Sequence, residues 1–155
     1  MRPVRDADRA FLLRLYTETR EDLAALPLPP PALTQMLELQ FDAQAQSYAQ
    51  SYPDHSWDII QMQGTPVGQF RVLRAPGEIR VIDLSLVAGI RGQGIGSHLL
   101  HILQQEARTA ALPLRLSVEH GNTRARALYQ RLGFAPGADL GVHLAMEWSP
   151  QDAPS

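Results

Sequence analysis

The 155-residue sequence contains no cysteine and no lysine. Without cysteine, the chain cannot use a thiolate nucleophile, a disulfide or a cysteine-ligated metal, so its fold needs no oxidising compartment. Without lysine, it cannot carry the lysine of a nucleotide-binding P-loop or form a Schiff base. All 14 basic residues are arginine, which stays charged and transfers protons poorly. Acid–base chemistry must therefore come from Asp, Glu, His, Tyr or water.

Long charged runs and long apolar runs are missing as well. The formal net charge is −2 at pH 7, and no run of like charges reaches the roughly five or six residues typical of a nucleic-acid-binding tail. No segment approaches the ~18 consecutive apolar residues of a membrane span. Residues 1–10 carry charges in place of the apolar core of a signal peptide. We therefore expect a cytoplasmic protein that binds neither nucleic acid nor membrane.

The length and composition predict one folded domain. Hydrophobic residues make up 45% of the chain and charged residues 19%, which is ordinary for a globular protein. We predict a single domain over residues 1–149 and a disordered tail over residues 150–155. The hydrophobic periodicity predicts the element order β-α-α-β-β-β-α-β-α-β-β. Because helical crossovers join some strands and tight turns join others, the fold class is α+β with one mixed sheet.

Apolar spacing and turn residues give the expected bounds of the elements. Helices are predicted over residues 11–23, 32–48, 95–110 and 123–132, and strands over residues 4–5, 57–63, 67–73, 79–87, 114–118, 134–139 and 142–148. Asp6 and Asp8 are expected to cap the first helix, and the strand over 79–87 to be buried on both faces.

The helix over residues 95–110 is predicted to have one apolar face and one exposed face. Ile102 is placed with Leu99 and Leu103 on the inner face. His98 and His101 are close enough on a helix to suggest a metal site. They fall on the outer face, however, which favours solvated side chains, and we predict no metal.

The most informative segment is rich in glycine and follows a predicted buried strand. Gly92, Gly94 and Gly96 stand at the start of the helix over 95–110. A helix N-terminus presents unpaired N–H groups and the positive end of its dipole, and glycine lets an anion approach the backbone. Arg91 adds a forked donor and Ser97 a hydroxyl. The segment suits a pyrophosphate; the alternative is a plain helix start in which the glycines only pack.

A dinucleotide-binding segment fits these residues poorly. That motif requires G-x-G-x-x-G, and Ser97 stands where the third glycine belongs. An acidic residue is expected about 20 residues further on to bind the ribose, but residues 112–116 contain neither Asp nor Glu. The sequence therefore disfavours dinucleotide binding.

Two motifs in the same order resemble the GNAT N-acetyltransferase superfamily. The first, Arg91-Gly-Gln-Gly-Ile-Gly96, is similar to that family's R/Q-x-x-G-x-G/A acetyl-CoA signature. The second, residues 118–134 with Asn122, Tyr129 and Phe134, is similar to V-x-x-x-N-x-x-A-x-x-L-Y-x-x-x-G-F. The resemblance covers residues 67–148 in detail, whereas the first 66 residues match only as β-α-α-β.

The resemblance implies the GNAT acyl-CoA N-acyltransferase fold, with a sheet that splays between the strands over 79–87 and 114–118. The thioester arm of acetyl-CoA would lie in that gap, bonded by backbone groups of the first strand's end, and the pyrophosphate would lie on the glycine segment. Asn122 would bond the pantetheine arm, cap the following helix, or both. The expected cofactor-binding residues are Leu86, Val87, Arg91, Gly92, Gln93, Gly94, Ile95, Gly96, Ser97, Asn122 and Tyr129.

The resemblance also implies an acyltransferase that moves an acetyl group from acetyl-CoA to a primary amine by direct attack in a ternary complex. Tyr129 is the expected general acid for the leaving thiolate, with core packing as its alternative role. Asp83 ranks ahead of Glu119 as the expected base, and His120 is a further candidate. The alternative for Asp83 is a buried salt bridge, for example to Arg80 or Arg115.

The acceptor, in that family, lies between the first two helices and the final hairpin. Here Tyr48 and Tyr52 could supply aromatic walls and Asp42 could attract a cationic amine. The alternative is an ordinary polar helix face. We expect a small-molecule or peptide amine, with a small molecule preferred.

Two other functions remain open for the same fold. One is a non-catalytic acetyl-CoA sensor or interaction domain, and the other is a structural domain whose glycines only pack. The strand over residues 142–148 is apolar enough to allow a homodimer.

Overall fold

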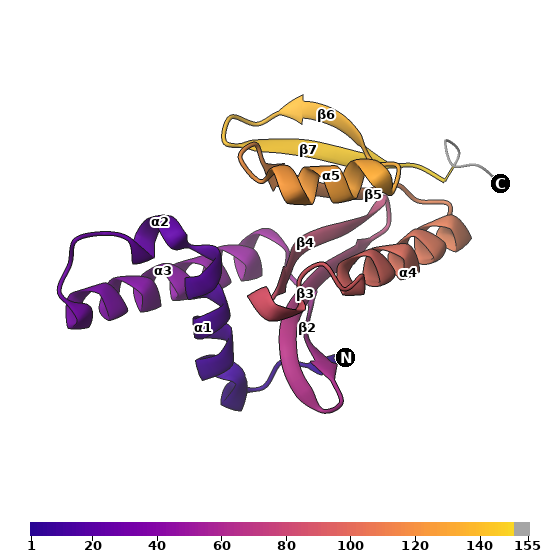
Figure 1. Ribbon diagram of the computed structural model, residues 1–155. Coiled ribbons are helices and arrows are strands. Elements are labelled where there is room, and N and C mark those ends of the chain that lie inside the picture. Colours follow the sequence, from indigo (N-terminus) through magenta and orange to yellow (C-terminus); the bar gives the residue numbers. More distant parts are fainter. Residues whose placement is uncertain (151–155) are drawn as a thin grey trace. The chain divides into compact units, whose positions relative to one another are not determined.

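The computed structural model describes residues 1–150, so the predicted tail lies outside the described residues apart from Pro150 (Figure 1). Its helices are α1 (Arg9–Thr19), α2 (Glu21–Ala24), α3 (Pro30–Ser51), α4 (Ile95–Ala110) and α5 (Thr123–Arg131). Its strands are β1 (Arg2–Pro3), β2 (Ser56–Met62), β3 (Thr65–Ala75), β4 (Glu78–Leu86), β5 (Leu114–Glu119), β6 (Ala135–Asp139) and β7 (His143–Trp148), in the sheet order β1-β2-β3-β4-β5-β7-β6. This confirms the predicted α+β class, with short α2 as an addition.

Two compact units divide the described chain and share strands β3 and β4. The first unit consists of residues 1–71 and 83–91, and the second of residues 72–82 and those from 92 onward. The single domain over residues 1–149 stays a prediction. No helix within residues 1–150 is long and apolar enough to cross a membrane.

The first unit builds its core from three helices and the β2–β3 hairpin. The hairpin turn places Gln63 and Gly64 at φ of 51° and 78°, the left-handed pair that suits a two-residue turn. Helix α3 begins at Pro30, where the fixed φ of proline fits the first helical turn. Buried apolar side chains of α1, α3 and β2 pack together: Leu12, Tyr16, Leu37, Phe41 and Ile59.

The second unit packs α4 and α5 with the C-terminal strands. Strand β5 pairs parallel with β4 and antiparallel with β7, and β6 pairs antiparallel with β7. Strand β7 is therefore an interior strand, and β6 forms the edge. The Gln104 side chain donates a 2.7 Å hydrogen bond to the Leu132 carbonyl, which ties α4 to the end of α5. The core includes Leu100, Leu114, Leu116 and Met146.

The expected cap of the first helix was wrong. The Asp8 carboxylate accepts the Arg5 N–H at 2.8 Å and two bonds from Arg2 at 2.8 and 2.7 Å, while α1 has no side-chain cap. These donors lower the pKa of Asp8 to about 2. The predicted helix over residues 11–23 also ends early, because the backbone at Arg20 leaves the helical region and α2 starts again at Glu21.

The predicted inner face of α4 is confirmed at Leu99, Leu103 and Ala107 but was wrong at Ile102. Ile102 is 48% exposed, whereas Leu100 is fully buried. The buried stripe also contains Gln104, whose amide is satisfied by the Leu132 carbonyl, and an apolar pattern alone gives no signal for such a residue. Strand β4 was likewise less buried than predicted, with only Ile79 and Val81 in the buried class. His98 and His101 are not in the buried core, as predicted.

Candidate functional site

A left-handed glycine turn opens α4 in the second unit. Gly92 and Gly94 have φ of 85° and 83°, and Gly94 is the N-cap of a helix end that no side chain caps. The His98 N–H bonds the Gly94 carbonyl at 3.0 Å, so the N–H groups of residues 95–97 have no partner inside the helix. Nothing lies within 4 Å of a Cβ built on Gly94, so the backbone conformation, not lack of space, requires glycine there. Unpaired N–H groups at a helix start can bind an anion.

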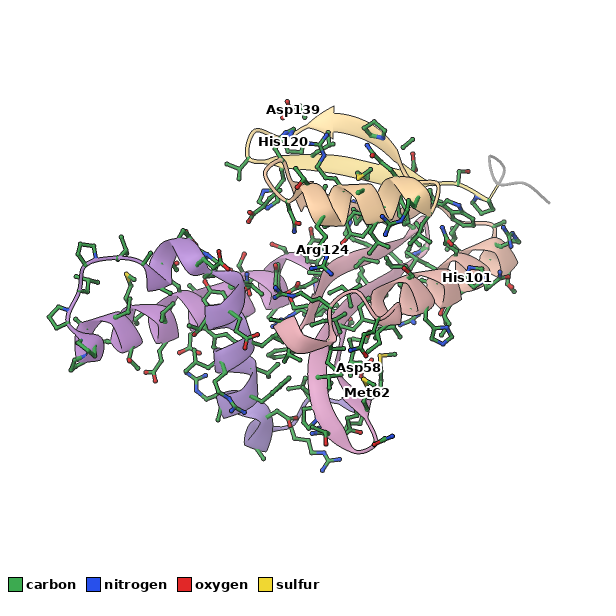
Figure 2. All side chains as sticks on the ribbon, viewed as in Figure 1. Asp58, Met62, His101, His120, Arg124 and Asp139 are labelled. Atoms are coloured by element: carbon green, nitrogen blue, oxygen red, sulfur yellow. The ribbon has the colours of Figure 1, made fainter. Side chains whose placement is uncertain are left out.

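Arg124 lies beside this turn, although the sequence analysis did not single it out. Its Nη2 is 2.9 Å from the position that a Cβ on Gly92 would take. The side chain projects from the first turn of α5 (Figure 2) and is exposed. The only sequence signal was its place two residues after Asn122. Its proximity to Gly92 follows from the fold.

Asn122 and Tyr129 occupy the two ends of α5. The Asn122 side chain accepts the Ala125 N–H at 3.1 Å, which confirms the capping alternative. Its amide hydrogens are not used by that bond. The half-buried Tyr129 ring packs at a tilt against Phe134 with 5.8 Å between centroids. The helix therefore fixes the positions of both residues within the second unit.

The end of β5 carries the other acid–base candidates. Glu119 is exposed. His120 is half-buried and its Nε2 lies 3.0 Å from Asp139 Oδ1, a pair visible at the β6–β7 hairpin (Figure 2). The Gly141 N–H and His120 hold the pKa of Asp139 below its usual range. His120 is thus tied to the hairpin, whereas Glu119 faces solvent.

The end of β4 belongs to the first unit, and its backbone groups already have partners there. The Val87 N–H donates to the Val67 carbonyl at 2.9 Å, and the Arg91 Nε donates to the Leu86 carbonyl at 3.0 Å. Arg91 is exposed. The Leu86 carbonyl is therefore held by an exposed side chain, while the Val87 N–H is fixed by a backbone bond.

Asp83 lies further back on β4, within a hydrogen-bonded cluster of the first unit. Gln69 Nε2 donates to its Oδ2 at 3.1 Å, and Ser85 Oγ donates to its Oδ1 at 2.9 Å. The surrounding protein raises the pKa of Asp83 by desolvation, against the Ser85 bond and the charge of Arg71. The structure does not support the alternative of a salt bridge to Arg80 or Arg115, because Arg80 pairs with Glu78 and Arg115 with Glu147.

Arg71 supplies a buried cation to the same cluster. It is 3% exposed, and its guanidinium carbon lies 3.6 Å from the Trp57 ring centroid and 4.9 Å from that of Tyr48. Its Nη1 bonds His55 Nε2 at 2.9 Å, and His55 Nδ1 bonds the Tyr52 carbonyl at 2.8 Å. Because arginine only donates, His55 Nε2 accepts and its proton sits on Nδ1.

The predicted acceptor residues fall into two groups. Burial and the charge of Asp83 raise the pKa of Tyr48 to about 12, so its phenol belongs to the Asp83 cluster. Tyr52 joins that cluster through its carbonyl, which His55 bonds. Asp42 instead forms a two-bond pair with Arg9 at 2.7 and 3.1 Å on the exposed surface. The structure thus brings Tyr48, Tyr52 and Asp83 together, whereas Asp42 pairs with Arg9 outside this cluster.

The described residues contain no set of ligands for a metal ion. No group of three or more His, Cys, Asp or Glu side chains within residues 1–150 could hold a metal ion. Each unit instead carries a candidate site of its own. The second unit has a helix start with a cationic side chain beside it, and the first has the hydrogen-bonded cluster around Asp83.

Comparisons with known proteins identify the family. A model of the acetyltransferase (GNAT) family matches residues 12–134. No protein with a curated description matches the sequence. The fold is similar to that of the PaiA N-acetyltransferase from Thermoplasma acidophilum in complex with coenzyme A, with a TM-score of 0.70 and 18% identity over 96% of each chain.

Two further solved structures are similar. An acetyltransferase from Thermus thermophilus has a TM-score of 0.66 and 20% identity over 96% of this chain and 94% of that one. A GNAT family acetyltransferase from Elizabethkingia anophelis with acetyl-CoA bound has a TM-score of 0.55 and 15% identity over 69% of this chain and 82% of that one. These likenesses support the fold, and the family match covers most of the sequence. The chain therefore belongs to the GNAT family of acetyltransferases.

Proposed function

We propose that this protein is an acetyl-CoA-dependent N-acetyltransferase that moves the acetyl group to a primary amine of a small molecule or peptide by direct attack in a ternary complex. The observation that best supports this proposal is the N-terminus of α4, which no side chain caps. There, after the left-handed Gly92 and Gly94, the N–H groups of residues 95–97 have no partner inside the helix. When bound, acetyl-CoA supplies an activated thioester carbonyl. Side chains and backbone groups of this chain would bind and orient both substrates and transfer the protons.

The residues at the helix start fit the diphosphate of coenzyme A. Gly94 leaves open space on its Cβ side, and the helix dipole favours negative charge there. Gln93, Ile95, Gly96 and Ser97 would contribute donors from the turn and the first helical turn. Arg124, beside Gly92, would add a charged donor from α5.

The pantetheine arm would be held by groups at the end of β4 and by Asn122. The Leu86 carbonyl would become available when Arg91 releases it, and the exposed Arg91 guanidinium could then turn to a phosphate. The Val87 N–H is already paired with Val67, so we assign Val87 a shaping role rather than a donor role. Asn122 would donate from the amide hydrogens that its capping bond leaves unused.

Asp83 is our choice for the base that takes the proton from the acceptor ammonium. Burial raises its pKa toward the range in which a base can both accept and release a proton. Glu119 is the second candidate, since its exposed carboxylate lacks the burial that distinguishes Asp83. Tyr129 is our choice for the acid that donates to the leaving thiolate.

The acceptor pocket is proposed around Tyr48 and Tyr52. Tyr48 presents a protonated phenol over a wide pH range, because its pKa is about 12. Asp42 would act as a longer-range attractor, since Arg9 already bonds its carboxylate. A homodimer through the C-terminal hairpin would use the exposed edge strand β6, since β7 is an interior strand. Sedimentation of the purified protein tests for it.

The proposal is tested by calorimetric titration with acetyl-CoA of the natural protein and two variants. Gly94→Glu should lose binding, because it adds strain and a carboxylate where the diphosphate would lie. Gly64→Glu is a matched control, since Gly64 has the same kind of φ, 78°, and equal open space. Binding that is lost only in Gly94→Glu supports the site, whereas no binding by the folded natural protein contradicts it.

A turnover assay then follows thiol release with polyamines, amino acids, an aminoglycoside and a peptide as acceptors. Product formation with an amine supports the proposed transfer. Tight binding of acetyl-CoA without turnover of any amine would instead indicate the sensor function.

A further inference from the structure

The two oxygens of Asp83 are bonded by groups with different hydrogen-bonding capacity. Oδ2 accepts from the Gln69 amide at 3.1 Å, and Oδ1 accepts from the Ser85 hydroxyl at 2.9 Å. An amide N–H can only donate, whereas a hydroxyl can donate or accept. The Oδ2 side therefore stays an acceptor, while the Oδ1 side can change its role.

Trp57 fixes the orientation of the Gln69 amide. The Trp57 indole N–H donates to Gln69 Oε1 at 2.7 Å, and an indole has no acceptor to offer in return. The carbonyl end of Gln69 must therefore face Trp57, which leaves its NH₂ end facing Asp83. Gln69 is 5% exposed, so a flipped amide would cost the indole N–H its acceptor and Oδ2 of Asp83 the Gln69 donor in a buried place.

We propose that Gln69 is a positioning residue that keeps Oδ2 of Asp83 in the acceptor role and directs the incoming proton to Oδ1. The proton leaves the acceptor's ammonium nitrogen, whose N–H bond electrons stay on nitrogen as the attacking lone pair. An O–H bond forms at Oδ1, and the Ser85 hydroxyl turns from donor to acceptor. This inference rests on the proposed function in which Asp83 is the base.

Arg71, Tyr48 and His55 surround Asp83 from neighbouring elements, and each has its own partners. Arg71 of β3 stays a cation between Trp57 and Tyr48. Tyr48 of α3 keeps its phenolic proton, since its pKa is about 12. His55, just before β2, uses Nε2 to accept from Arg71 and Nδ1 to donate to a carbonyl. A change in the NMR titration of the Asp83 carboxyl carbon therefore reflects the hydrogen-bond donors of Asp83 itself.

The test removes, one at a time, the Gln69 amide and the Trp57 indole that orients it. Gln69→Met deletes both amide functions at similar length, and Trp57→Phe deletes the N–H while keeping a ring beside Arg71. Gln104→Met is the matched control, because Gln104 is also buried and bonded, at 2.7 Å, but in the second unit. The Asp83 carboxyl is followed by carbon NMR over a pH series without substrate, and kcat and KM are measured over the same range.

Loss of a donor to the ionised carboxylate should raise the Asp83 midpoint by about half a pH unit to one unit in Gln69→Met, the size expected for one hydrogen bond. A smaller rise is expected in Trp57→Phe and none in Gln104→Met. The acidic limb of the kcat profile should move by the same amount, with KM for acetyl-CoA unchanged.

The proposal is overturned if the Asp83 midpoint stays in place in both variants, or if Gln104→Met moves it equally. It is also overturned if the midpoint moves but the kcat profile does not. The NMR titration needs no turnover, so a protein that never acetylates an amine would contradict the proposed function while the titration still decided the Gln69 arrangement. Should Gln69→Met fail to fold, the Trp57→Phe titration alone decides.

Discussion

The two units of the protein carry their chemistry in different ways. In the second unit, the glycine turn, the start of α4 and the capping Asn122 are short local segments, so each can be identified from neighbouring residues. In the first unit, the Asp83 cluster draws on α3, β2, β3 and β4, with partners up to 35 residues apart between Tyr48 and Asp83. Local backbone sites can therefore be identified from a sequence, whereas side-chain networks can be identified only from the fold.

The largest effect is expected from loss of the proposed general acid, Tyr129. Tyr129→Phe removes one hydroxyl and should lower kcat by about 10²- to 10³-fold, the usual size of general acid catalysis, with little change in KM. Steady-state assays over a range of amine concentrations measure it.

Tyr16→Phe is the control for the tyrosine hydroxyl in the other unit. Its hydroxyl accepts from Arg20 at 2.8 Å within the core of the first unit, away from the proposed reaction. That variant should keep kcat. A Tyr129→Phe enzyme with the natural rate would exclude Tyr129 from the chemical step.

The sequence predicted the second unit well for a physical reason. Gly92 and Gly94 stand at positions with positive φ, and Asn122 caps α5, so backbone requirements dictate these residue types locally. Arg124 could not be predicted from the sequence, because only the packing of α5 brings its side chain close to Gly92.

The sequence predicted less of the first unit. Asp83 could be chosen as a carboxylate on a strand that was predicted to be buried, but no sequence spacing connects it to Gln69 or Trp57. The expected role of Asp42 depended on its acidity alone, and the structure pairs it with Arg9, which is 33 residues away. The expected cap at Asp8 was wrong for a similar reason, since Arg2 and the Arg5 N–H compete for its carboxylate.

A smaller effect should follow from loss of the cation beside the glycine turn. Arg124→Gln should weaken binding of coenzyme A about 10-fold, because one charged hydrogen bond to phosphate is lost. The loss should be equal for 3′-dephospho-coenzyme A if Arg124 contacts the diphosphate, and absent for it if Arg124 contacts the 3′-phosphate.

Arg131→Gln is the matched control, because Arg131 is an exposed arginine in the last turn of the same helix. Calorimetry with both ligands and all three proteins completes the test. Unchanged affinity in Arg124→Gln would remove this residue from the proposed site.

Replacing the charged Asp83 side chain by a neutral one should raise the free energy of unfolding by about 1 kcal/mol, comparable to one hydrogen bond. Desolvation raises the pKa of Asp83 in the folded state above 3.8, even against the attraction of Arg71. For a raised pKa, the stabilising contribution is present below the unfolded value and is lost as pH rises through the folded value. Asp83→Asn should therefore be more stable than the natural protein at neutral pH and lose that advantage near pH 4, about the ordinary pKa of an aspartate.

Urea unfolding at a series of pH values measures this difference. The asparagine oxygen would face Gln69 and its NH₂ would face Ser85, whose hydroxyl can accept. A variant that is destabilised equally at all pH values would show that the ionised carboxylate is required by its neighbours, which would contradict the raised pKa.

The smallest effect is expected at the exposed Arg9–Asp42 pair, which tests how far the acceptor site extends along α3. Both side chains are more than half exposed, at 51% and 55%, and exposed pairs of this kind contribute little to stability. Asp42→Asn should change stability by less than about 0.5 kcal/mol and raise KM for a cationic amine no more than about twofold, because Arg9 already neutralises this carboxylate. Tyr48→Phe, within the Asp83 cluster, should raise KM more. If Asp42→Asn instead raises KM strongly while an uncharged amine is unaffected, then Arg9 must leave the carboxylate when the acceptor binds, and the site includes the surface of α3 as the sequence first indicated.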